Sequence, residues 1–154
     1  MKNKELAKIF SEIAQYLKME NIPFKPFAYE KASLALESLE EDIKDLYQKE
    51  GLRGLEKIPG VGKSLALKIE EYLKTGKIQY YEVLKKKIPV DLSEIVSIEG
   101  MGPKRAKILY QKLGIRTLEE LEEAAKKHKI APLFGFGEKT EKNILEGIDF
   151  LKKS

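Results

Sequence analysis

One short pattern occurs three times in the 154-residue sequence and limits the fold more than any other feature: IPGVGKSLALKI from residue 58, IEGMGPKRAKIL from residue 98 and LFGFGEKTEKNI from residue 133. Each copy has an apolar residue two positions before a glycine, then Gly-apolar-Gly, then an apolar residue seven positions after the second glycine. The spacing predicts a tight turn between two helices. The glycines allow a positive φ or the close approach of another backbone, while Val61, Met101 and Phe136 plug the core between them.

The first copy contains Gly62-Lys63-Ser64, which also ends the ATP-binding P-loop. A P-loop requires a glycine five residues before Gly62, where this chain has Lys57, and a strand before the loop, where the sequence has helix formers. Only the first copy has Lys-Ser. The shape that the three copies share therefore does not depend on nucleotide binding.

The second glycine of each copy leads into a helix whose first amides lack intrahelical partners, so free N–H groups and the positive end of the helix dipole face outward. A DNA phosphate suits such a site, and nearby basic side chains add salt-dependent attraction. The alternative is a purely structural corner, and in the third copy Glu138 and Glu141 favour packing over phosphate binding. The predicted DNA-binding residues are Gly60, Gly62, Lys63, Gly100, Gly102, Lys104, Arg105, Gly135, Gly137 and Lys139.

Composition excludes several other kinds of site. The chain has no cysteine and one histidine, so thiolate metal centres, cysteine nucleophiles and a zinc site are excluded. A net charge of +4 is compatible with nucleic acid but not diagnostic of it. No apolar stretch is long enough to span a membrane and the N-terminus resembles an amphipathic helix, so we expect a cytoplasmic protein without membrane contact.

The pattern of apolar residues predicts an all-α fold. A first helix begins behind Asn3 as its cap and stops before Pro23, and a third covers residues 41–50. A second covers residues 26–39, and its predicted inward residues are Phe27, Ala32, Ala35, Leu36 and Leu39. Further helices follow the repeated turns, and Thr117-x-x-Glu120 predicts a capping box. No segment shows the alternation typical of a strand.

The repeated turns resemble helix-hairpin-helix motifs, and the whole chain resembles the N-terminal part of bacterial and archaeal family X DNA polymerases. The resemblance rests on PFAYEKAS from residue 26, IPGVGKSLALKIEEYLKTGK from 58, IEGMGPKRAKILYQKLGI from 98 and FGFGEKTEKNILEGI from 134. It implies two small helical subdomains carrying three hairpins: a lyase-type domain over residues 1–88 and a duplex-binding subdomain over residues 89–154. The sequence leaves open whether this is a polymerase fragment or a stand-alone protein.

The resemblance also implies a lysine nucleophile. Members of the family can use a lysine to attack the sugar of a 5′-deoxyribose phosphate, and the matching residue is Lys68, with Lys25 and Tyr29 matching the 5′-phosphate pocket. Two positions depart from the family, because Ser64 replaces a second lysine and Phe24 replaces a histidine. Whether this chain is a 5′-deoxyribose phosphate lyase or only binds DNA is left open.

Two further expectations follow from the resemblance. Backbone carbonyls of the hairpins can hold Na⁺ or K⁺ against the DNA, and the matching residues are Glu56, Ile58 and Val61 in the first hairpin and Val96, Ile98 and Met101 in the second. The polymerase reaction requires three carboxylates that hold two magnesium ions on a sheet, and this chain has no strand to carry them. We therefore expect no polymerase activity and no required cofactor.

The sequence thus predicts a monomer that binds the backbone of gapped, nicked or intact duplex DNA with little sequence preference, as part of a family X polymerase-like base-excision repair protein. An alternative is a non-catalytic module for protein interaction or structure, because helical hairpin pairs can also form dimerisation surfaces.

Overall fold

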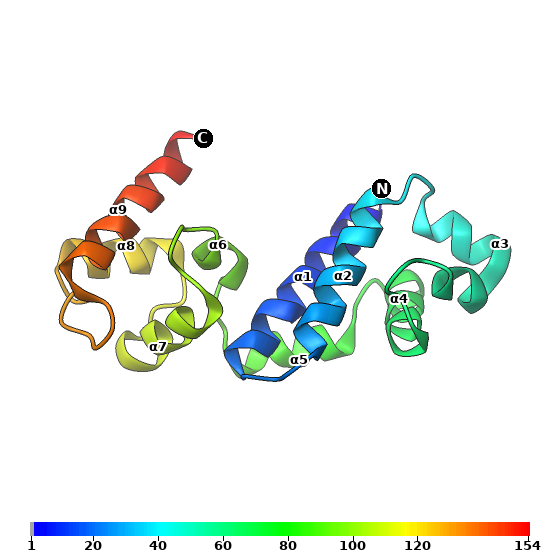
Figure 1. Cartoon of the computed structure of the whole chain (residues 1–154), viewed down its shortest axis with the longest axis horizontal. Coiled ribbons are helices and arrows are strands. Elements are labelled where there is room, and N and C mark those ends of the chain that lie inside the picture. The colour runs from blue at the N-terminus through cyan, green and yellow to red at the C-terminus, as the bar shows by residue number, and fades with distance from the viewer. Residues whose placement is uncertain (1) are drawn as a thin grey trace. The chain divides into compact units, whose positions relative to one another are not determined.

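The computed structural model of the chain describes residues 2–154, which form helices joined by short loops with no strand among them. They divide into two compact units, of which the first ends at Ile88 and the second covers Pro89–Ser154. The first unit contains α1 (Lys2–Met19), α2 (Lys25–Ser38), α3 (Ile43–Glu56), α4 (Lys63–Thr75) and α5 (Gln79–Lys87), and the second contains α6 (Leu92–Val96), α7 (Pro103–Leu113), α8 (Leu118–Lys126) and α9 (Gly137–Lys153) (Figure 1). The predicted all-α fold class is confirmed.

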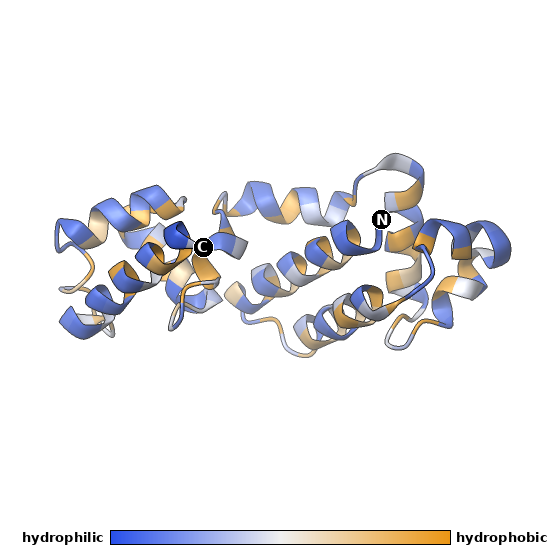
Figure 2. Ribbon diagram, turned by 90° about the horizontal axis from the view of Figure 1, so that it is seen from above, coloured by the Kyte–Doolittle hydropathy of each residue, from blue (hydrophilic) through white to orange (hydrophobic). Residues whose placement is uncertain are grey.

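The core of the first unit lies between α1 and α2, which pack side by side (Figure 1). Leu6, Phe10 and Ile13 of α1 are completely buried, and Ser33 Oγ of α2 donates a hydrogen bond to the Ala7 carbonyl at 2.6 Å. Figure 2 shows hydrophobic and hydrophilic residues together on most helices, as expected for helices with one buried face. No helix of residues 2–154 combines the length and apolar character needed to cross a bilayer.

Helix α2 buries most of the residues that the sequence places inward, with Phe27 as the exception. Ala32 and Leu36 are completely buried, and Ala35 and Leu39 are partly buried. Phe27 was expected inside, but it is 66% exposed, while Pro26 and Tyr29 are buried. Leu34, two turns beyond Phe27, is also exposed. Because α2 has apolar residues on both sides, its periodicity does not reveal that Phe27 is exposed.

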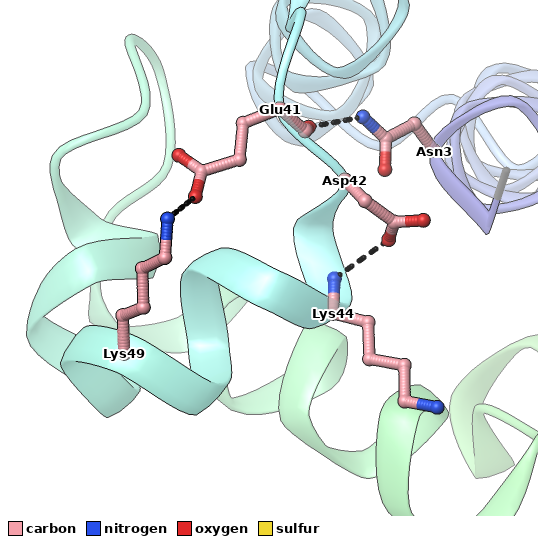
Figure 3. A network of polar contacts seen from close by, with 5 residues as sticks. All are labelled: Asn3, Glu41, Asp42, Lys44 and Lys49. Atoms are coloured by element: carbon pink, nitrogen blue, oxygen red, sulfur yellow. Dashed lines mark hydrogen bonds and ion pairs between the residues drawn. The ribbon is translucent and has the colours of Figure 1, made fainter.

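The start of α1 is tied to the connection between α2 and α3 by Asn3, which is buried (Figure 3). Its Nδ2 donates to the Glu41 carbonyl at 2.8 Å, and its Oδ1 accepts from the Ile43 amide at 2.8 Å. The predicted helix cap at Asn3 is therefore wrong, because the side chain is used across the fold. Asp42 caps α3 instead, and its carboxylate accepts from the Lys44 amide.

The third helix extends further than its predicted span of residues 41–50. The chain breaks at Gly51 (φ 64°, ψ −150°), as the glycine suggested, but it resumes a helical course to the end of Ile43–Glu56. The added turn buries Leu55 completely and leads directly into the first repeated turn. Gly76 ends α4 in the left-handed conformation (φ 79°), as expected for a helix C-terminal glycine.

The second unit contains the predicted capping box in a modified form. Thr117 Oγ1 accepts from the Glu120 amide at 3.1 Å, which is the expected half. The Glu120 carboxylate, however, accepts from the Arg116 amide at 2.9 Å rather than from the amide of Thr117 itself. The pair therefore still fixes where α8 begins.

A buried carboxylate joins α9 to the loop that follows α8. Glu141 is 4% exposed, and it accepts hydrogen bonds from the amides of Ile130 (3.1 Å) and Ala131 (2.7 Å) and contacts His128 Nδ1 at 2.7 Å. Burial opposes ionisation of Glu141, but the hydrogen bonds from Ala131, His128 and Ile130 outweigh it and hold the pKa of this carboxyl below its usual value. The carboxylate therefore stabilises the loop before the third hairpin.

We predict that Glu141→Gln destabilises the chain at pH 7 by about 1–2 kcal/mol, because hydrogen bonds to a charged acceptor are replaced by bonds to a neutral amide. Since the folded-state pKa is lowered, the stabilising contribution is present above the pKa of the unfolded chain and is lost as the pH falls through the folded-state pKa. Urea unfolding of both proteins at pH 7 and at pH 3 measures this, and the difference should shrink at pH 3.

The exposed neighbour Glu138 provides the control, and Glu138→Gln should leave the free energy of unfolding within about 0.5 kcal/mol at both pH values. Equal stability of Glu141→Gln and the wild type at pH 7 would contradict the stabilising role of the carboxylate.

Candidate nucleic-acid interface

The first two repeated turns have the same backbone hydrogen bond. The Val61 amide donates to the Ile58 carbonyl at 3.0 Å in the first turn, and the Met101 amide donates to the Ile98 carbonyl at 3.0 Å in the second. All four residues are buried, so each turn is closed by a backbone bond and anchored by its predicted plug. The hairpins thus have one shape although their sequences differ.

The two glycines of each turn have different roles. Gly60 (φ 83°) and Gly100 (φ 86°) lie in the left-handed region that favours glycine. Gly62 (φ −91°) and Gly102 (φ −99°) have extended backbones that other residues adopt readily, and a Cβ added at either one would meet no atom within 4 Å. The fold therefore requires only the first glycine, while the second leaves open space at the start of the next helix.

Helices α4 and α7 begin directly after these second glycines, and neither N-terminus has a side-chain cap. Lys63 and Lys104, in the first turns of the two helices, are exposed. Uncapped amides, the positive end of the helix dipole and a lysine thus come together at both places. This combination suits a phosphate group.

The third turn departs from this geometry, although Gly135 (φ 85°) repeats the first glycine. Gly137 has φ 81° instead of an extended backbone, and its amide donates to the Ala131 carbonyl at 3.2 Å. The exposed Glu138 follows, with the exposed Lys139 beside it. The helix start after the third turn also has no side-chain cap, but its first amide is already bonded and an acidic residue follows it.

Arg105, predicted to contact DNA, links two hairpins in the second unit. Its Nη1 donates to the Gly100 carbonyl at 2.9 Å and its Nη2 to the Gly135 carbonyl at 3.4 Å. The guanidinium carbon also lies 5.5 Å from the centre of the Phe136 ring. The sequence does not reveal this link, because the bonded groups are backbone carbonyls.

The structure places two of the three predicted lyase residues in one stack. Lys68 Nζ lies 5.2 Å from the centre of the Tyr80 ring, and Tyr80 stacks on Tyr29 with 6.3 Å between ring centres. Burial, and then Tyr80, raise the pKa of the Tyr29 hydroxyl, which therefore remains a neutral donor. Lys25 is exposed one turn before Tyr29 on α2. The sequence did not indicate that Tyr80 lies between Lys68 and Tyr29.

The predicted cation sites at the hairpins consist of backbone carbonyls. In the described part of the chain, no three acidic, histidine or cysteine side chains are close enough together to bind a metal ion. The Ile58 and Ile98 carbonyls each accept one hydrogen bond within the turn and have a second lone pair available. These two carbonyls can therefore accept a further contact, and the Na⁺ or K⁺ site stays a prediction.

Comparison with known proteins identifies helix-hairpin-helix domains in both units of the chain. The family model described as "Helix-hairpin-helix domain" matches residues 1–78, and that described as "SAM-like Helix-hairpin-helix tandem" matches residues 92–149. The chain is similar to the DNA polymerase/3′-5′ exonuclease PolX of Bacillus subtilis (strain 168), at 34% identity over 96% of this chain and 25% of that protein, in its N-terminal part. It is also similar to DNA polymerase lambda of Arabidopsis thaliana, at 30% identity over 77% of this chain and 21% of that protein. The chain spans a quarter or less of the length of these curated relatives.

We predict that Gly60→Ala and Gly100→Ala each destabilise the fold by about 1–2 kcal/mol, because alanine is strained in the left-handed region. At Gly60 the added Cβ would also lie 3.0 Å from Cγ of Lys31. Gly62→Ala and Gly102→Ala should change stability by less than about 0.5 kcal/mol. Urea unfolding of the four variants tests this, and equal losses at Gly100 and Gly102 would contradict the division of roles.

Proposed function

The chain belongs to the helix-hairpin-helix domain family, and from this premise we propose that it binds the phosphate backbone of DNA through its first two hairpins. The observation that carries the proposal is that two turns of the same geometry expose an uncapped helix start beside a glycine that the fold itself does not require. A phosphate at each site would accept hydrogen bonds from the helix amides and face a lysine. Such contacts position the protein on DNA without reading its sequence.

The relatives that the chain matches are named as DNA polymerases, which supports a role in a polymerase-like repair protein. In that role the protein would bind gapped or nicked duplex as a monomer. The two hairpins belong to separate units, and each would bind its own phosphate segment. Na⁺ or K⁺ on the hairpin carbonyls would add positive charge at the same places.

We expect the affinity for a fluorescent gapped duplex, measured by anisotropy, to fall linearly with salt on a double-logarithmic plot, with a slope of about −0.9 per phosphate neutralised. Lys104→Ala should weaken binding and reduce the slope by about 1, because one cation is lost. Lys112→Ala is the matched control at the other end of α7, and it should have a smaller effect.

Gly102→Val tests the open space at the second hairpin. The variant should unfold at nearly the wild-type urea concentration but bind DNA at least tenfold more weakly, because the added side chain occupies the place of the phosphate. If the wild type binds neither gapped nor intact duplex at low salt, the proposal fails. A mass that rises with protein concentration in light scattering would then favour the alternative of a protein-interaction module.

A second candidate function is 5′-deoxyribose phosphate lyase activity, which the Lys68 stack favours. The neutral amine of Lys68 would attack C1′ of the ring-opened sugar and lose water to form a Schiff base. Removal of a C2′ proton then breaks the C3′–O bond and releases the downstream 5′-phosphate strand. Tyr29 and Lys25 would hold the 5′-phosphate of the sugar, with the Tyr29 hydroxyl as donor.

Borohydride should trap the wild-type protein covalently on a nick with a 5′-deoxyribose phosphate, because it reduces the Schiff base. Lys68→Ala should abolish trapping and leave DNA affinity within about threefold, whereas Lys25→Ala should weaken capture of the sugar phosphate. Lys74→Ala, on the same helix but paired with Glu70, is the control and should trap like the wild type. A wild type without adduct, or a Lys68 variant that traps equally well, would exclude this activity.

A further inference from the structure

The tip of the third hairpin carries a phenylalanine that the fold does not use. The Phe134 side chain is 100% exposed, the highest exposure among the large hydrophobic residues of the described chain. The same position of the repeated pattern is Pro59 in the first hairpin and Glu99 in the second, both of which suit exposure to water. An aromatic ring is therefore presented at only one of the three tips.

The loop that presents Phe134 is held by its own backbone bonds. The Phe136 amide donates to the Leu133 carbonyl at 3.1 Å, and the Gly137 amide donates to the Ala131 carbonyl at 3.2 Å. Phe136 is buried beneath the loop. The ring of Phe134 thus projects from a closed turn, and little backbone freedom would be lost when it contacts a ligand.

Arg105 holds this tip beside the second hairpin. Its guanidinium bonds to the Gly100 carbonyl of the second turn and to the Gly135 carbonyl, which directly follows Phe134. DNA bound at the start of α7 would therefore lie close to the ring. At the third turn the Gly137 amide is already bonded to the Ala131 carbonyl and Glu138 follows it, so a second phosphate is a poor ligand there.

We propose that Phe134 stacks on a nucleobase that is exposed where one strand of the duplex is interrupted. The inference rests on the proposed DNA binding, because DNA bound at the second hairpin would place a base near the Phe134 ring. Every base has a π-face, so an aromatic side chain stacks on unpaired bases without sequence preference. Intact duplex has no unstacked base near the tip, so Phe134 gives the protein its preference for gapped DNA.

The test compares Phe134→Ala with the wild-type chain on a gapped duplex that carries 2-aminopurine at the gap and on the intact duplex. Phe134→Ala should bind the gapped duplex about 5- to 150-fold more weakly, the range expected for loss of one stacked base. Binding to intact duplex should change less than twofold. Wild-type protein should alter the 2-aminopurine fluorescence, and Phe134→Ala should not.

Two variants complete the design. Phe134→Trp should keep gap binding and the fluorescence change, because it keeps an aromatic ring. Phe150→Ala removes another exposed phenyl ring of the same unit, at 72% exposure on α9, and should bind both DNAs like the wild type. If Phe150→Ala weakened gap binding as much as Phe134→Ala, the assignment to Phe134 would be overturned.

The outcomes separate this inference from the proposed function. If the wild type binds no DNA, the proposed function fails and the stacking role falls with it. If the wild type binds DNA and Phe134→Ala binds gapped DNA equally well, only the stacking role is overturned. The same holds if Phe134→Ala lowers the affinity for gapped and intact DNA by the same factor. A concentration-dependent dimer that Phe134→Ala abolishes without a change in DNA binding would also overturn it, in favour of a protein contact.

Discussion

The constraint on which the site depends is the closed turn between two helices, in which a left-handed glycine precedes a buried apolar plug. At the first turn the glycine is Gly60 and the plug is Val61, and at the second they are Gly100 and Met101. The backbone bond across each turn fixes the direction in which the next helix leaves. Because the hydrogen bond across the turn does not involve the amides at the start of that helix, these amides remain available for a ligand.

The proposed binding depends on two hairpins that have the same geometry. A single uncapped helix start is a common feature and attracts an anion only modestly. Two such starts, each with an exposed lysine and open space beside a glycine, can neutralise several phosphates of one DNA molecule, and the contributions then add. The third hairpin diverges because Gly137 has a positive φ, while Glu141 points inward to the loop before it.

The sequence predicted side-chain roles correctly where the interacting residues are close in the sequence, and failed where they are far apart. The caps at Thr117 and Gly76 were predictable, since they depend on residues a few positions apart. Asn3 and Phe27 were placed wrongly, because Asn3 bonds to a segment distant in the sequence and α2 is apolar on both sides. The role of Arg105 between two loops could not be inferred either, since its acceptors are backbone carbonyls.

The sequence by itself determined the all-α fold, the three repeated turns and the identity of the plugs, because these follow from periodicity and from the spacing of glycine and apolar residues. Only the tertiary structure decided that the first glycine of each turn carries a positive φ and that, in the third turn, the second glycine carries one as well. It also brought Tyr80 between Tyr29 and Lys68, and the Gly135 carbonyl, which follows Phe134, within reach of Arg105. Those relations join residues far apart in the chain, and only the packing of the helices sets the distances between them.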